Sequence, residues 1–163
     1  MGPTPPEAKV LSREALLARH GRPRTHRVVF TNGCFDLLHR GHVAYLVAAR
    51  ALGDVLVVGV NTDASARRLA KEGSRPFVGE DDRAYVLASL ECVDVVTLFD
   101  EDTPLSLVTA LLPDVLVKGG DYAPEGVVGR DVVEAAGGVL KLIPFVEGYS
   151  TTSLLKRIRG GSR

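Results

Sequence analysis

From Arg27 onward the chain alternates between short, nearly continuous apolar runs and longer stretches in which apolar residues recur at helical spacing. This alternation constrains the fold more than any other feature, because strands that alternate with helices build βαβ units around a parallel sheet. The apolar runs cover residues 28–31, 55–60, 93–99, 115–118 and 139–145. The helical stretches cover residues 42–52, 64–71, 81–90, 104–111, 127–136 and 151–158.

The apolar runs lack the polar alternation of a half-solvated strand, which predicts strands that are buried on both faces. We therefore expect an α/β domain with an open five-stranded parallel sheet, strand order 3-2-1-4-5, right-handed crossovers and helices on both faces. Such a sheet binds ligands at the carboxyl ends of its strands, next to the point where the strand order reverses. Strands 1 and 4 are neighbours there, so the segments that follow strands 1, 4 and 5 should lie together.

The first 26 residues differ in composition from the rest of the chain. Three of the first six residues are proline, a short helical stretch follows over residues 12–20, and residues 21–24 read Gly-Arg-Pro-Arg. We expect residues 1–26 to be a partly ordered leader with a loosely docked short helix. Residues 27–163 are then one domain, since 163 residues are too few for two full ones.

Composition excludes several functional classes. Lys and Arg number 20 and are balanced by 20 Asp and Glu, whereas a protein that coats nucleic acid needs a broad excess of positive charge. The two cysteines, Cys34 and Cys92, indicate neither a disulfide framework nor a metal cluster. No apolar run approaches the ~20 residues of a membrane span, and the N-terminus lacks a signal pattern. We expect a cytoplasmic protein that binds neither nucleic acid nor membranes.

The segment after the first predicted strand contains two histidines three residues apart, His39 and His42, where a loop enters a helix. At this spacing they project from one side of the first helical turn, and Gly41 between them lets a ligand approach the backbone. Free N–H groups at a helix start favour an anion, and imidazoles can donate to phosphate oxygens. The alternative is that one histidine caps the helix and the other is solvated. The chain contains neither a P-loop nor a G-x-G-x-x-G fingerprint.

The stretch Cys34-Phe35-Asp36-Leu37-Leu38-His39-Arg40-Gly41-His42 resembles the F-D-x-x-H-x-G-H motif of the cytidylyltransferase-like nucleotidyltransferases. Residues 27–159 further resemble the heptose 1-phosphate adenylyltransferase branch, which often forms the C-terminal half of a bifunctional kinase/adenylyltransferase. The narrower likeness is carried by Asp102-Thr103-Pro104, Leu116-Val117-Lys118-Gly119-Gly120-Asp121-Tyr122 and Gly148-Tyr149-Ser150-Thr151-Thr152.

The resemblance implies a Rossmann-like fold and the transfer of AMP from ATP to a sugar 1-phosphate. The expected acceptor is D-glycero-D-manno-heptose 1-phosphate, and the products are ADP-heptose and pyrophosphate. Mg²⁺ would bridge the ATP phosphates without a direct protein ligand. The resemblance also implies a homodimer and a separate kinase that supplies the phosphorylated heptose.

Roles for individual residues follow from the same resemblance. His39 and His42 would be catalytic. The nucleotide would be bound by residues at or after the ends of strands 1, 4 and 5, namely Gly33, Cys34, Phe35, Lys118, Gly119, Asp121, Ser150 and Thr151. The candidates for contacting the sugar phosphate are Arg75, Arg83, Asp63 and Lys71.

Most of these residues also have a structural interpretation. Gly119-Gly120 can form a tight turn with Asp121 as a helix cap, and Ser150 is a good N-cap. Arg75 and Arg83 can be surface ion-pair partners of the acidic run at residues 80–82.

The sequence departs from one set of relatives. Residues 145–148 read Phe-Val-Glu-Gly, where the glycerol 3-phosphate cytidylyltransferases carry Arg-Thr-Glu-Gly. The missing arginine disfavours cytidylyl transfer and leaves a phosphate contact to Lys118 or another arginine. Two alternatives remain: a cytidylyltransferase for glycerol 3-phosphate or a similar phosphoalcohol, and a nucleotide-binding module without catalysis.

Overall fold

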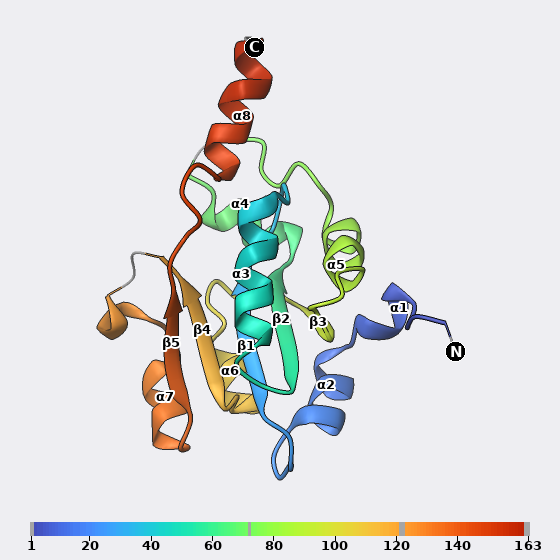
Figure 1. Ribbon diagram of the computed structural model, residues 1–163, viewed down its shortest axis with the longest axis vertical. Helices are drawn as coiled ribbons and strands as arrows, with labels where there is room; N and C mark the ends of the chain where they lie inside the picture. Colours follow the sequence, from blue (N-terminus) through green and yellow to red (C-terminus); the bar gives the residue numbers. More distant parts are fainter. Residues whose placement is uncertain (1, 72, 121–122, 162–163) are drawn as a thin grey trace.

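A parallel five-stranded sheet forms the centre of the computed structural model, which describes residues 2–71, 73–120 and 123–161 (Figure 1). Its strands are β1 (Val28–Gly33), β2 (Val55–Asn61), β3 (Val95–Phe99), β4 (Val115–Gly119) and β5 (Val139–Ile143). Their order in space is β3-β2-β1-β4-β5, which confirms the predicted topology.

Helices connect the strands and flank the sheet. They are α1 (Pro6–Lys9), α2 (Arg13–His20), α3 (Arg40–Arg50), α4 (Asp63–Leu69), α5 (Glu80–Ala88), α6 (Leu105–Leu111), α7 (Arg130–Ala135) and α8 (Thr151–Gly160), with a 3-10 turn at Pro124–Gly126. Within the described part of the chain, every helix is too short or too polar to cross a membrane.

The hydrophobic core lies in two layers, one on each face of the sheet. Leu46 of α3 and Leu87 of α5 pack with Val58 on one face. Leu16 of α2 and Leu107 of α6 pack with Phe30 on the other face. The alternating side chains of the central strands enter both layers, which is why these strands read as continuous apolar runs rather than alternating ones.

The hydrogen-bonded pairing between β1 and β4, the strands at the switch point, is shorter than the pairing between β1 and β2. The β1–β2 ladder runs from Val28–Val55 to Gly33–Val60, whereas the β1–β4 ladder pairs only Val29 with Val115 and Phe30 with Leu116. Beyond these pairs the carboxyl halves of β1 and β4 are not joined by the ladder. This opening lies at the edge of the sheet where the predicted site residues follow their strands.

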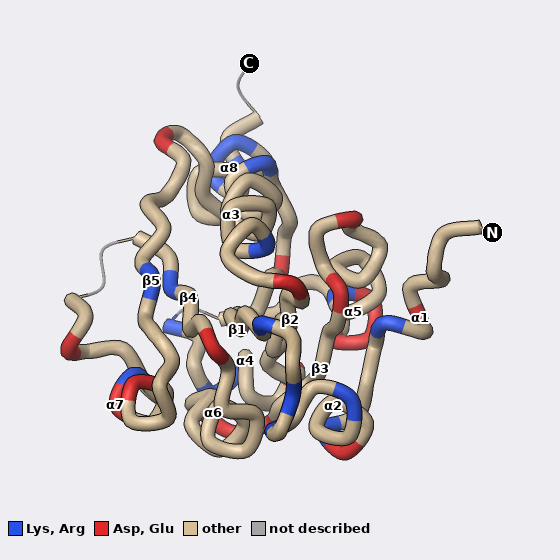
Figure 2. The backbone as a smooth tube through the Cα atoms, turned by 60° about the horizontal axis from the view of Figure 1, so that its bottom comes forward, with Lys and Arg blue, Asp and Glu red and all other residues tan. Residues whose placement is uncertain are grey.

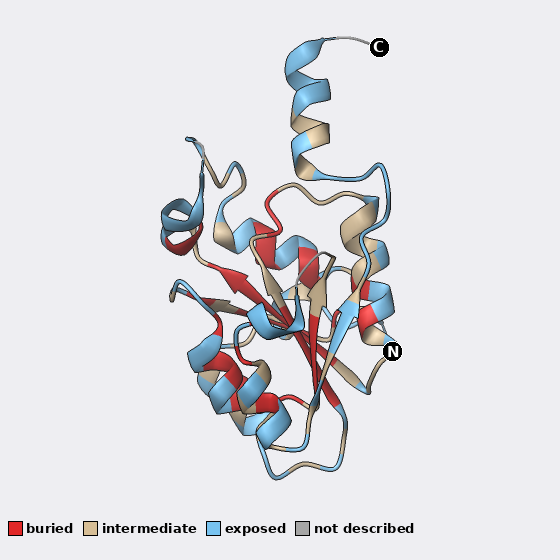
Figure 3. Cartoon of the chain, turned by 90° about the vertical axis from the view of Figure 1, so that its left-hand side faces the viewer, coloured by how far each residue is buried: buried red, intermediate tan, exposed pale blue. Residues whose placement is uncertain are grey.

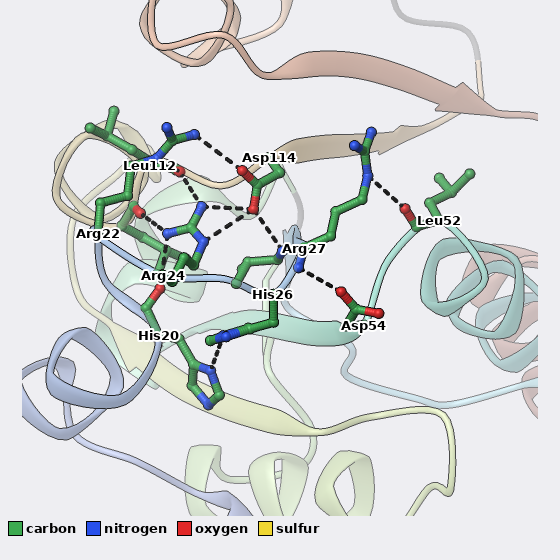
Figure 4. A network of polar contacts seen from close by, with 11 residues as sticks. His20, Arg22, Arg24, His26, Arg27, Leu52, Asp54, Leu112 and Asp114 are labelled. Atoms are coloured by element: carbon green, nitrogen blue, oxygen red, sulfur yellow. Dashed lines mark hydrogen bonds and ion pairs between the residues drawn. The ribbon is translucent and has the colours of Figure 1, made fainter.

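The leader is more firmly attached than the sequence predicts. The predicted short helix is α2, capped by Ser12, and Leu16 on it is fully buried. Arg24 donates to a carboxylate oxygen of Asp114 at 2.9 Å, and Asp114 also accepts the backbone N–H of Val28 (Figure 4). The expectation of loose docking was wrong, because buried apolar and ionic partners far along the chain hold the leader against the sheet.

The final strand and helix are more exposed than the rest. The prediction that every strand is buried on both faces is wrong for β5, an edge strand in which Val139 and Leu142 are exposed. No residue of α8 is buried, and the helix stands out from the body beyond the sheet (Figures 1 and 3).

Charged residues are unevenly distributed over the helices: α5 begins with three acidic residues, whereas α8 carries basic ones (Figure 2).

Candidate active site

A cleft of about 390 Å³ opens at the carboxyl ends of β1 and β4. Its lining includes every described residue that the resemblance assigns to catalysis or nucleotide binding: Gly33, Cys34, Phe35, His39, His42, Lys118, Gly119, Ser150 and Thr151. Asp121 lies outside the described residues. The predicted convergence of three chain segments on one edge of the sheet is therefore present in the structure.

His39 and His42 hold the first turn of α3 in a reciprocal cap. Nδ1 of His39 accepts the backbone N–H of Gly41 at 3.1 Å, and Nδ1 of His42 accepts the backbone N–H of His39 at 3.3 Å. A nitrogen that accepts an N–H carries no proton of its own, so each neutral ring is protonated on Nε2. Capping therefore uses one nitrogen of each histidine and leaves an Nε2–H donor for a ligand. The two interpretations of the pair, cap and binding group, are compatible.

The histidines are neutral in the free protein. Burial and, to a smaller extent, the neighbouring His39 together lower the pKa of His42 to about 4. Burial also lowers the pKa of His39. The two ring centroids lie 3.9 Å apart with an interplanar angle of 31°. An anion placed against both Nε2–H groups would stabilise added positive charge, as a phosphoryl-transfer site requires.

Close packing shapes the walls around the histidines. Phe35 has φ of +50°, and its ring centroid lies 5.6 Å from that of His42. A Cβ atom on Gly41 would lie 2.9 Å from Cε1 of His39 and 3.0 Å from Cβ of Tyr149. Only glycine fits between the two histidines without displacing one of them.

The turn after β4 is tight, as one sequence interpretation predicts, and it also borders the cleft; its expected helix cap, Asp121, lies outside the described residues. Gly120 has φ of +69°, and the ring of Phe145 covers it so closely that a Cβ atom there would lie 2.0 Å from the ring. Gly119 and Phe145 both line the cleft. The tight turn therefore brings the backbone and an aromatic face into the cleft together.

Lys118 supplies the positive charge of the cleft. Its Nζ donates to Oδ1 of Asn32 at 2.5 Å, and burial lowers its pKa to about 8.

Four lining residues were not predicted from the sequence: Asn32 and three aromatic residues, Tyr45, Phe145 and Tyr149. Asn32 directly follows the first apolar run and precedes Gly33, a predicted site residue. That position could have identified Asn32 as a lining residue of the site.

A second cavity of about 620 Å³ adjoins the first through their shared lining residue Cys34. Two of the predicted sugar-phosphate candidates, Arg75 and Lys71, line this cavity, and α8 adds Arg159. Asp36 accepts the backbone N–H groups of residues 77 and 78 at 2.9–3.0 Å, which anchors the segment that carries Arg75. The cavity therefore has a cationic lining, and its carboxylate, Asp36, is occupied by backbone donors and lies 4.0 Å from the guanidinium of Arg75.

The other two sugar-phosphate candidates lie elsewhere. Arg83 is 1% exposed and lines neither cavity. Its guanidinium donates to the carbonyl oxygens of Cys34, Asn61 and Val78. It also forms a 2.8 Å ion pair with Asp63. Arg83 is therefore buried and connects the loops of the site by hydrogen bonds, rather than pairing with the acidic run on the surface. Asp63 is its counter-ion.

The N-terminus of α8 closes one side of the cleft. Oγ of Ser150 accepts the backbone N–H of Ser153 at 3.0 Å, so Ser150 is the N-cap as the sequence predicts. Ser150 and Thr151 line the cleft, and the first turn of a helix is where backbone N–H groups lack intrahelical acceptors. The helix continues along the second cavity, which it lines with Thr152, Leu155 and Arg159. One helix therefore borders both cavities.

Sequence comparisons match this architecture. The family model described as cytidylyltransferase-like matches residues 30–157. A protein named Bifunctional protein HldE from Geotalea uraniireducens is 58% identical over 158 residues, covering 96% of this chain and 32% of the relative. Its namesake from Geobacter sulfurreducens is 61% identical over 132 residues, covering 81% and 27%. The chain therefore spans about a third of the length of these relatives.

Solved structures show the same fold. The lipopolysaccharide core biosynthesis protein from Thermoplasma volcanium is 29% identical, with a TM-score of 0.62, covering 77% of this chain and 100% of that chain. The pantothenate synthetase from Thermus thermophilus has a TM-score of 0.52 at 18% identity, covering 85% of this chain and 62% of that chain. At that identity the second likeness concerns the fold alone.

Proposed function

This chain belongs to the cytidylyltransferase-like family, and from that premise we propose that it transfers AMP from ATP to D-glycero-D-manno-heptose 1-phosphate. The products are ADP-heptose and pyrophosphate. The curated relatives named Bifunctional protein HldE support this assignment, as does the motif around Lys118-Gly119-Gly120. The solved lipopolysaccharide core biosynthesis protein supports a role in the same area of metabolism.

One observation carries the proposal: both histidines use Nδ1 for the helix cap, which leaves Nε2–H as the donor of each ring, and both rings line the cleft that also contains Lys118. Two neutral donors and one cation suit a triphosphate whose negative charge increases at the leaving group during transfer. The described lining residues include no activated nucleophile, and this reaction needs none, because the acceptor phosphate is itself the nucleophile.

The reaction balances without a further reactant. An oxygen of the sugar phosphate attacks the α-phosphorus in line, a new P–O bond forms, and the bond from the α-phosphorus to the bridging oxygen breaks. The leaving pyrophosphate takes the electron pair. His39 and His42 donate hydrogen bonds to the phosphate oxygens, and the cleft orients the two substrates. Positioning and electrostatic stabilisation supply the rate enhancement.

The second cavity is the proposed acceptor site. Lys71, Arg75 and Arg159 line it, and it meets the nucleotide cleft at Cys34. A sugar phosphate bound there by its phosphate would have that group near the α-phosphorus of ATP. Arg75 suits this role because a guanidinium binds phosphate oxygens in bidentate geometry.

Mg²⁺ enters as part of the MgATP substrate in this proposal. The described lining of the nucleotide cleft offers imidazoles, hydroxyls and an ammonium rather than carboxylates, and hard oxygen ligands are what Mg²⁺ prefers. The triphosphate itself would therefore hold the ion. Removing Mg²⁺ with EDTA should stop turnover while the melting temperature of the free protein stays unchanged.

The proposal is tested by pyrophosphate release. ATP and CTP are each combined with D-glycero-D-manno-heptose 1-phosphate, glucose 1-phosphate and glycerol 3-phosphate. The highest kcat/KM is expected for ATP with the heptose phosphate, and the His39→Asn/His42→Asn double variant is the inactive control. Preference for CTP with glycerol 3-phosphate would replace the proposal with a cytidylyltransferase, and nucleotide binding without pyrophosphate release from any pair would indicate a non-catalytic module.

A further inference from the structure

The floor of the nucleotide cleft is the opening between β1 and β4. The backbone ladder that joins the two strands ends at Phe30–Leu116, yet both strands continue toward the cleft. Two side-chain bridges span the gap instead. Oγ1 of Thr31 donates to the carbonyl oxygen of Val117 at 3.1 Å, and Nζ of Lys118 donates to Oδ1 of Asn32. The first bridge is buried beneath the second, which borders the cleft.

The outer bridge pairs a cation with a neutral amide. An ammonium group has three N–H donors, and Asn32 accepts one of them. Within residues 2–71, 73–120 and 123–161, no carboxylate forms an ion pair with Lys118. A partly buried charge without a counter-ion is costly, and burial accordingly lowers the pKa of Lys118 to about 8. A bound phosphate would remove that cost.

On the premise of the function proposed above, we propose that Asn32 is a positioning residue for phosphate binding. Its amide oxygen holds the ammonium group of Lys118 across the gap, so that the remaining N–H donors meet the nucleotide phosphates beside His39 and His42. An aspartate at position 32 would neutralise the ammonium, whereas an apolar residue would leave the flexible lysine stem without an anchor. A neutral acceptor is the one choice that fixes the ammonium and leaves its charge for the ligand.

The positioning role has a signature that a purely structural role lacks, namely the titration of Lys118. The chain contains five lysines, so side-chain ¹³C resonances of labelled lysine can be resolved by NMR, and Lys118→Met identifies the signal. In the free protein Lys118 should titrate near pH 8. Asn32→Asp should raise this pKa by about one unit or more, because an opposite charge at hydrogen-bond distance favours the ammonium form. Thr31→Val, which removes the inner bridge, should leave it unchanged.

The second arm adds ligands to the wild-type protein. MgATP, MgCTP and inorganic pyrophosphate are titrated separately, and binding of a phosphate ligand should raise the pKa of Lys118 by about one unit or more. Asn32→Leu, which is similar in shape but cannot accept a hydrogen bond, should reduce that response and lower kcat/KM about tenfold or more. The alkaline limb of the kcat/KM profile should move to higher pH in Asn32→Asp.

These outcomes separate the inference from the function on which it rests. A Lys118 titration that Asn32→Asp does not move would overturn the positioning role, and so would a titration indifferent to all three phosphate ligands. A response to MgCTP but not MgATP would overturn adenylyl transfer and support the positioning role. A response to MgATP without turnover on any acceptor would likewise overturn the catalytic proposal alone.

Discussion

At the scale of single residues, each of the two histidines uses one ring nitrogen to cap helix α3 and keeps the other as a donor for a ligand in the cleft. Nδ1 of each ring caps the first turn of α3, and Nε2–H remains for the ligand. Because the cap fixes the ring orientation, the donors are held in place before the substrate binds. This double use predicts that fold stability and turnover can be separated by substitution.

His42→Asn should separate the two roles. Its Oδ1 can replace Nδ1 as the acceptor for the backbone N–H of His39, but no donor remains at the Nε2 position. We expect stability to change by less than about 0.5 kcal/mol and kcat to fall roughly 100- to 1000-fold. Urea unfolding and steady-state pyrophosphate release measure the two effects. His42→Ala, which loses both roles, is the comparison, and a His42→Asn enzyme with near wild-type kcat would contradict the mechanism.

The pKa of His42 predicts a pH-dependent stability. The folded value of about 4 is below the ordinary value of 6.5, so the folded protein favours the neutral ring. The resulting stability is fully present above pH 6.5 and is lost as the pH falls from 6.5 toward 4. Urea midpoints at pH 7 and pH 5 should therefore differ more for the wild type than for His42→Asn. Equal pH dependence in the two proteins would argue against a half-buried neutral ring.

At the scale of elements, α8 links the two cavities. Its N-cap Ser150 borders the nucleotide cleft, and three residues of its first two and a half turns line the second cavity. The helix buries no residue against the body, so its stability depends strongly on its own capping. A ligand that contacts both its start and its side would stabilise it.

Substitutions of Ser150 test whether the start of α8 binds an anion. Asn and Asp both cap helices well, but only Asp adds a negative charge beside the triphosphate. We expect Ser150→Asp to raise the KM for ATP about tenfold or more, whereas Ser150→Asn stays near wild type. Amide hydrogen exchange in α8 should be similar in both variants and faster in Ser150→Ala. Equal KM values for the Asp and Asn variants would exclude a phosphate at this helix end.

At the scale of the whole molecule, one carboxylate joins the end of the leader to the amino-terminal end of the sheet, in addition to the buried Leu16 and the Arg13–Glu101 ion pair. Asp114 pairs with Arg22 and Arg24 and accepts the N–H of Val28 (Figure 4). Burial acts to raise the pKa of Asp114, but the Val28 N–H and the two guanidinium groups outweigh it, so the pKa is below its ordinary value. This network lies at the opposite end of the strands from the cleft.

Asp114→Asn should therefore destabilise the protein without altering the site. The Arg24 side chain is only 4% exposed and would lose its carboxylate partner, which costs about 2–4 kcal/mol. Urea unfolding at pH 7 measures the loss, and Glu134→Gln, which breaks the exposed pair with Arg130, should cost no more than about 0.5 kcal/mol. Because the folded pKa of Asp114 is lowered, the difference between wild type and Asp114→Asn should shrink as the pH falls below 3.8. A constant difference would contradict the role of the ionised carboxylate.

The sequence alone determined the strands, most helices and the convergence of the site. Continuous apolar runs and helical spacing are local patterns, and carboxyl ends of parallel strands share one edge of the sheet. Residues at or beyond the ends of strands 1, 4 and 5 had to meet there, as His39, Lys118 and Ser150 do.

Only the tertiary structure decided which partner each polar side chain finds. Arg75 and Arg83 lie eight positions apart in similar surroundings, yet one borders a cavity and the other is buried. The partners of Arg83 come from the loop after β1, the end of β2 and the loop before α5, which no local pattern connects. The docked leader, the exposed face of β5 and the Asn32–Lys118 bridge likewise depend on contacts between segments that are distant in the sequence. Spacing along the chain is a local quantity, whereas burial and pairing depend on residues that meet only when the sheet has formed.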